Sequence, residues 1–128
     1  MDDLESKVSL ERVIATRELN ARSSREPEHA RENEMLLRLL EALANTPDGI
    51  LTSLTSAALE ACRAESAGIS LLEANGSDAI FHWRAVVGEL ARFAGRRVPR
   101  WSSPCGVVID SDMTQLFRWP ARHYAGYE

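Results

Sequence analysis

The sequence predicts an α+β fold, with an antiparallel sheet flanked by helices and an N-terminal helical extension. Three observations predict it. The first half of the chain places apolar residues at helical spacing, a strand–turn–strand pattern follows, and a serine-proline pair then starts one more short helix. With 128 residues, 45% apolar and 27% charged, the composition is that of one packed domain and excludes a fully disordered chain.

Residues 1–33 form the predicted helical extension, because they are rich in glutamate and arginine and contain no glycine. Between residues 2 and 20 the apolar side chains fall roughly on one helical face. These are Leu4, Val8, Ala15 and Leu19. Pro27 then breaks the pattern, and residues 34–128 are expected to form the domain that carries the sheet.

Two further helices are predicted before the sheet. The first opens at Glu28, and a face expected to turn to the core is formed by Met35, Leu36, Leu39, Leu40 and Leu43. The second opens at Thr46-Pro47-Asp48, where threonine can cap free amides and proline suits the first helical position. It runs to about Arg63, and its packing face, expected to lie against a sheet, is Ile50, Leu54, Ala57, Ala58, Ala61 and Cys62.

The hairpin is the clearest pattern in the chain. Residues 67–72 and 79–87 predict two strands, and Asn75-Gly76-Ser77 predicts the turn between them. In the second strand alternation places three side chains on one face, namely Phe81, Trp83 and Ala85.

The remaining third of the chain predicts short elements. Residues 89–101 are expected to form a short helix and an arginine-rich loop. Ser103-Pro104 repeats the cap-and-proline signal and predicts a short helix through Ile109. Residues 114–118 predict a third, brief strand.

Several of these segments also carry a resemblance to a known family. They are the alanine-rich helix 50–63, the strands 64–72 and 81–88, and the stretch 98–110 with its Ser103-Pro104-Cys105-Gly106 motif, followed by Gln115-Leu116-Phe117 and Pro120. From about Met35 to its end the chain resembles the front part of a GAF domain, the small-molecule-sensing fold of bacterial signalling proteins. It is similar to a subgroup of GAF domains found at the front of sensor histidine kinases and related signalling proteins of proteobacteria.

The resemblance implies a sensory or regulatory module in signal transduction, related to the input region of a two-component sensor histidine kinase and not itself an enzyme. A complete GAF domain continues with two more strands and a closing helix, which do not follow here. The resemblance therefore implies a truncated sheet with one open edge. We expect the chain to cover this edge by forming a homodimer or by binding a partner protein. The alternative is a scaffold fragment that senses nothing and pairs with a partner through that edge.

The resemblance also implies a ligand cavity between the sheet and its overlying loops. The candidate ligand-binding residues are Phe81, Trp83, Trp101, Cys105 and Trp119. The alternative interpretation of the four aromatic residues is that they pack in the core. Cys105, at a predicted helix start, is either a reactive thiol or a small buried residue, whereas Cys62 is expected to be packing only. The sequence does not name the ligand or a cofactor.

Other functions are disfavoured by composition. A net charge of −4 argues against a nucleic-acid binder, and the absence of an apolar run of about 20 residues argues against a membrane protein. The acidic start of the chain leads into no apolar segment of a signal peptide, so we expect a cytoplasmic protein.

Catalytic and metal-binding patterns are also missing from the sequence. Two cysteines without a CxxC or HExxH pattern predict no metal site. His29, His82 and His123 have no catalytic partner at a recognisable spacing and are expected to be surface or hydrogen-bonded histidines. The cluster Arg92, Arg96, Arg97 and Arg100 could contact an anionic ligand, but a solvated loop is the favoured interpretation.

Overall fold

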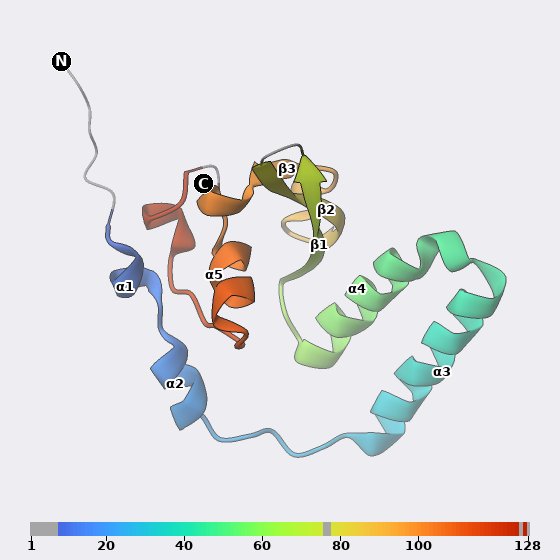
Figure 1. The fold of residues 1–128 in the computed structure, drawn as a ribbon. Coiled ribbons are helices and arrows are strands. Elements are labelled where there is room, and N and C mark those ends of the chain that lie inside the picture. Colours follow the sequence, from blue (N-terminus) through green and yellow to red (C-terminus); the bar gives the residue numbers. More distant parts are fainter. Residues whose placement is uncertain (1–7, 76–77, 126, 128) are drawn as a thin grey trace. The chain divides into compact units, whose positions relative to one another are not determined.

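The chain forms two compact units (Figure 1). The structure is a computed structural model and describes residues 8–75, 78–125 and 127. One unit is Arg25–Arg97, and the other combines Met1–Ser24 with Val98–Glu128. Helices together with a three-stranded sheet confirm the predicted α+β class.

The unit Arg25–Arg97 begins with two helices joined by a tight turn. Helix α3 (His29–Asn45) and helix α4 (Ile50–Cys62) are linked by Thr46 and a 3-10 turn, Pro47–Gly49. Both predicted helices are confirmed. The predicted cap is wrong, because the Thr46 hydroxyl donates to the Ala42 carbonyl at 3.2 Å and so closes α3 rather than opening the next helix.

The predicted hairpin is confirmed as strands β1 (Ser66–Asn75) and β2 (Asp78–Gly88), which pair antiparallel. The predicted turn residues Gly76 and Ser77 lie outside the described residues. A third short strand, β3 (Arg97–Pro99), gives the sheet order β1-β2-β3. It lies where a helix and loop were predicted, and the predicted helix is only a 3-10 turn at Ala91–Phe93.

The register between β1 and β2 shifts once. Ile69 lies opposite Ala85, but the next residue, Ser70, lies opposite Trp83. One residue of β2, Arg84, is therefore extra, and Trp83 and Ala85 fall on opposite faces of the sheet. The prediction that Ala85 shares a face with Phe81 and Trp83 is wrong for this reason, because strict alternation assumes an unbroken ladder.

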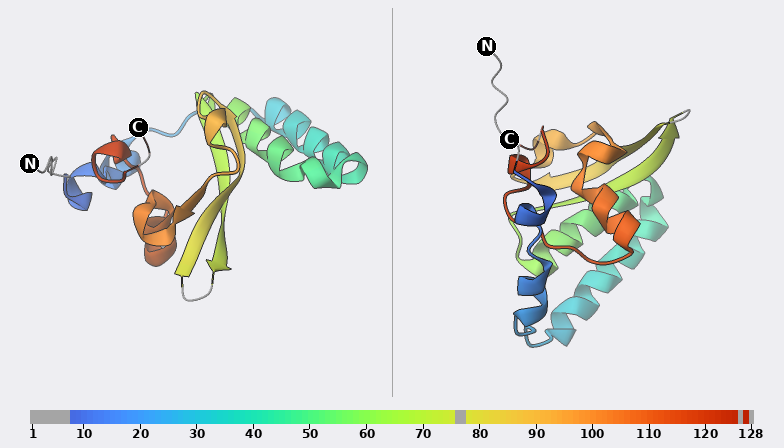
Figure 2. Two further views of the ribbon diagram at one scale, coloured as in Figure 1. Left: turned by 90° about the horizontal axis from the view of Figure 1, so that it is seen from above. Right: turned by 60° about the vertical axis from the view of Figure 1, so that its left-hand side comes forward.

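Helix α4 packs on the sheet, and α3 packs on α4 (Figure 2). The most deeply buried residues of this unit are Met35, Thr55, Phe81 and Ala85. The predicted packing face of α4 is wrong in detail, because Leu54 and Cys62 are exposed while Thr55 is buried. Burial of Thr55 is tolerated because its hydroxyl donates to the Leu51 carbonyl at 2.6 Å.

In the other unit the N-terminal segment pairs with the last part of the chain. Two short helices, α1 (Leu10–Val13) and α2 (Thr16–Ala21), replace the single helix predicted over residues 2–20, of which residues 2–7 lie outside the described part. The break has a clear cause, since Ile14 forms a β-bridge with Phe117. The strand predicted over residues 114–118 is reduced to this one bridge.

Helix α5 (Pro104–Ser111) follows the predicted cap-and-proline signal. The Ser103 hydroxyl accepts the Cys105 backbone N–H at 3.2 Å, which confirms the serine as the cap. A side chain at Gly106 would not fit, because a Cβ there would lie 2.7 Å from the Arg100 carbonyl oxygen.

Replacement of Gly88 by alanine is expected to destabilise the unit Arg25–Arg97. Gly88 has φ +87°, and an added Cβ would lie 2.2 Å from the Glu65 carbonyl oxygen. We expect Gly88→Ala to lower the free energy of unfolding by about 1–3 kcal/mol, as measured by urea denaturation. Gly49→Ala is the matched control, because a Cβ at Gly49 meets no atom within 4 Å. Equal stabilities of the two variants would contradict the strain argument.

Candidate functional site

The most exposed large apolar side chains of the unit Arg25–Arg97 form a row on α3, which we call the leucine row. Its members and their exposed fractions are Leu36 (58%), Leu37 (61%), Leu40 (62%) and Leu43 (53%). Spacings of three and four residues place them on one side of the helix over two turns. Contiguous exposed leucines of this kind are typical of an interaction surface.

The leucine row corrects a prediction. Leu36, Leu40 and Leu43 were expected to face the core, but of the predicted set only Met35 is buried and Leu39 is half-buried. The cause is that α3 packs mainly against one helix, α4. A single neighbour covers a stripe narrower than the apolar face that the sequence provides.

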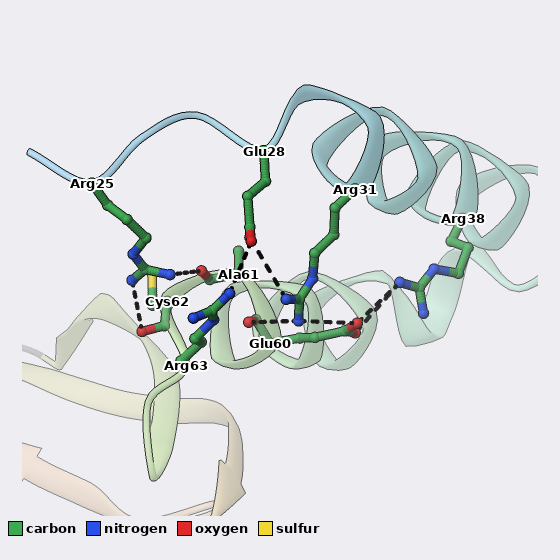
Figure 3. Close-up of polar contacts among 8 residues, drawn as sticks. All are labelled: Arg25, Glu28, Arg31, Arg38, Glu60, Ala61, Cys62 and Arg63. Carbon is green, nitrogen blue, oxygen red and sulfur yellow. Dashed lines mark hydrogen bonds and ion pairs between the residues drawn. The ribbon is translucent and has the colours of Figure 1, made fainter.

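Arginine and glutamate side chains fasten the start of α3 to the end of α4 (Figure 3). The Glu60 carboxylate of α4 lies 3.4 Å from the Arg38 guanidinium and 3.7 Å from that of Arg31. Glu28, just before α3, pairs with Arg31 at 3.6 Å and with Arg63 at 2.9 Å. All these side chains are partly exposed, so each pair stabilises the fold by less than about 1 kcal/mol. The network therefore helps to set the orientation of α3 on α4 but contributes little to stability.

Arg25 completes the network at the end of α4. Its guanidinium donates to the carbonyl oxygens of Ala61 and Cys62 at 3.3 and 3.4 Å. These are carbonyls of the last helical turn, which lack partners within the helix, and a cation there also complements the helix dipole. Figure 3 shows Arg25 reaching both carbonyls from the segment before α3.

An open groove of about 330 Å³ lies beside this network. It is lined by Arg25, Glu26, Pro27, Glu28, Arg31, Glu32, Met35, Ala61 and Cys62. Cys62 is a free and exposed thiol. The prediction that Cys62 serves packing alone is therefore wrong, because α4 turns its other side to the sheet.

The five predicted ligand-binding residues are divided between the two units. Phe81 and Trp83 lie on β2, whereas Trp101, Cys105 and Trp119 belong to the other unit. Trp101 is 83% exposed, and Trp119 is exposed with the Arg122 guanidinium 4.4 Å from its ring centre. Cys105 lies half-buried on α5. The alternative prediction, core packing, is confirmed for Phe81 and is wrong for Trp101 and Trp119.

Trp83 has a specific neighbour on β1. A Cβ added at Gly68 would lie 2.9 Å from the Trp83 ring, so the indole lies against the bare backbone of that glycine. The close approach of the ring explains why a glycine stands inside a strand here.

A charged cluster crosslinks the three strands and was not predicted from the sequence. The Glu73 carboxylate on β1 accepts from His82 Nδ1 on β2 at 2.9 Å and from the Arg97 guanidinium on β3 at 2.8 Å. Arg84 lies 3.8 Å from the same carboxylate. The available signal was the hairpin register, because a turn at residues 75–77 sets Glu73 diagonally across from His82 on one face.

The hydrogen bond from His82 holds the pKa of Glu73 below its ordinary value of 4.5, and Arg97 adds to this effect. Protonation of Glu73 would remove the negative charge that the donors on β2 and β3 share and so weaken both bonds. The carboxylate form is therefore part of the folded sheet at neutral pH.

The other predicted surface residues have local partners. His29 lies 3.6 Å from Glu32 on the surface, and His123 Nδ1 lies 2.7 Å from the Val8 carbonyl oxygen, so the expectation of surface or hydrogen-bonded histidines is confirmed. Within the arginine cluster, Arg92 and Arg96 lie over the Phe93 ring at 4.8 and 5.1 Å. Arg97 binds Glu73 as described above, and Arg100 pairs with Asp110. The cluster is thus dispersed over separate contacts.

Comparison with known proteins adds no family assignment. No family model, curated protein or solved structure matches this chain. In the described part of the chain no helix is long and apolar enough to cross a bilayer. The same residues bring no three histidine, cysteine or acidic side chains together as a metal site.

Substitutions on α3 are expected to lower stability strongly at a buried residue and only slightly at an exposed one. Met35→Ala removes a buried side chain and should cost about 2–5 kcal/mol of unfolding free energy. Leu40→Gln changes an exposed side chain to another good helix former and should cost less than about 1 kcal/mol. Urea denaturation measures both. A Leu40→Gln loss as large as that of Met35→Ala would show that the leucine row is core.

The Glu73 cluster is expected to make stability depend on pH. Because folding lowers the pKa of Glu73 below 4.5, its contribution is complete above that value and is lost as pH falls further. Glu73→Gln should therefore lower the melting temperature at pH 7 and have a smaller effect at pH 3. The control is Glu89→Gln, because Glu89 is an exposed glutamate just beyond the end of β2. An equal effect of Glu73→Gln at both pH values would contradict this account.

Proposed function

We propose that this chain is a non-catalytic sensory or regulatory module of the GAF type, acting in the cytoplasm and related to the input region of a two-component sensor histidine kinase. The proposal is supported by the sequence resemblance from Met35 onward. The helix, the two strands and the serine-capped helix on which that resemblance rests correspond to α4, β1, β2 and α5.

One observation carries the proposal, namely a continuous packing path from the sheet to an exposed apolar surface. Helix α4 contacts both long strands on one side and α3 on the other, and α3 presents the leucine row. A change in the way α4 lies on the sheet would therefore move the leucine row. Such a path would let a module report an event at its sheet to a protein bound at the leucine row.

The event at the sheet is, in this proposal, the binding of a small molecule against β2 near Trp83, which is only partly buried. Such a ligand shifts the position of α4 only if it binds one arrangement of helix and sheet more tightly than another. The response is then read by whatever protein covers the leucine row, either a second copy or a different partner.

A second candidate function, a scaffold without a ligand, is favoured by the free side of β1. Among the described residues, β1 pairs with β2 alone, so it is the edge strand of the sheet. It is ten residues long and exposes Leu71 and Leu72. A strand of a partner protein could pair with such an edge.

A thermal-shift screen separates the two functions. The full chain is heated with nucleotides, haem, bilins and small aromatic compounds. For the sensor we expect saturable stabilisation by at least one class, about 2.7 kcal/mol at a ligand concentration a hundred times its Kd. Trp83→Phe should reduce that stabilisation, whereas Leu90→Gln, an exposed site beyond β2, should preserve it. Absence of any shift would reject the sensor and favour the scaffold.

A further inference from the structure

Acidic side chains flank the leucine row on both sides. On the helix surface Glu34 and Glu41 are the neighbours of Leu37, three residues before it and four after it. On the opposite side, Glu32 is the neighbour of Leu36, four residues before it. All three glutamates are exposed.

No arginine of α3 balances these charges, because both arginines of the helix point to α4. Arg31 and Arg38 reach the Glu60 carboxylate at 3.7 and 3.4 Å. Glu34 and Glu41 make no ion pair with a described residue, and Glu32 has the exposed imidazole of His29 at 3.6 Å. The open side of α3 is thus an apolar stripe between acidic borders.

We infer that the leucine row docks an amphipathic helix of a partner protein whose own apolar row is bordered by lysine or arginine. Apolar side chains along one helix face are the usual partners of such a row, and basic borders complement the glutamates. The helix α3 has 17 residues, about 25 Å, which is long enough for a helix of comparable length to lie along it.

A second copy of α3 is disfavoured by the same borders. Parallel or antiparallel pairing of two α3 helices along their leucine rows would bring glutamates close to glutamates, and like charges destabilise such contacts. An anionic lipid surface is disfavoured for the same reason. The inference rests on the proposed function in one respect, that the leucine row is the surface read by a partner.

The test uses two designed peptides of about 21 residues, long enough to form a helix on the surface. Both carry leucine at the first and fourth position of each heptad. One has lysine at the flanking positions, and the other has glutamate there. Fluorescence anisotropy with the full chain measures Kd. The lysine peptide is expected to bind saturably and at least about tenfold more tightly than the glutamate peptide at low salt, and less tightly as salt is added.

Variants locate the binding. Leu36→Gln with Leu40→Gln should weaken binding of the lysine peptide at least about tenfold, whereas Leu90→Gln, an equally polar change at an exposed leucine outside α3, should leave it unchanged. Glu34→Gln with Glu41→Gln should weaken binding and its salt dependence without touching an apolar contact. Circular dichroism checks that each variant keeps its helix content.

The inference is overturned if the lysine peptide does not bind, if both peptides bind equally, or if Leu36→Gln with Leu40→Gln has no more effect than Leu90→Gln. It is also overturned if sedimentation shows a dimer that Leu40→Gln converts to monomer, because the occupant is then a second copy. Failure of the small-molecule screen with intact peptide binding would reject the sensor alone. Stabilisation by a small molecule without peptide binding would reject this inference alone.

Discussion

The organisation of the unit Arg25–Arg97 depends on α4 being the one layer between the sheet and α3. Helix α4 is covered on two sides, by β1 and β2 and by α3. Helix α3 is packed mainly against α4, so its apolar face is wider than the surface available to cover it. The exposure of four leucines follows from this arrangement and not from any unusual feature of α3 itself.

Local signals in the sequence predicted the elements well. Helical spacing placed α3 and α4, the strand–turn–strand pattern placed β1 and β2, and Ser103-Pro104 placed α5 with its cap. Each of these features depends on residues close together in the chain. Local backbone preferences and side-chain caps therefore suffice to specify them.

Which face of an element is buried depends on partners that are distant in sequence. The apolar set of α3 was expected in the core because its leucines lie at helical spacing. Such a stripe shows how much surface could be buried, but it does not show whether a neighbouring element is present to cover it. The shift at Arg84 is another example, since an extra residue in one strand changes every later side-chain direction. The break at Ile14 arises from pairing with Phe117, about a hundred residues away. The leucines of the candidate surface could thus be identified from the sequence, but their exposure could not be predicted from it.

The buried Thr55 has a consequence for motion between layers. Its hydroxyl donates to the Leu51 carbonyl within α4, so this buried side chain spends its hydrogen bond inside the helix and not on a neighbouring element. Displacement of the helix along the sheet by a fraction of a side-chain width breaks no hydrogen bond at this residue. A threonine bonded within its own helix does not oppose small shifts of α4, whereas a residue hydrogen-bonded to a neighbouring element would favour one position of the helix.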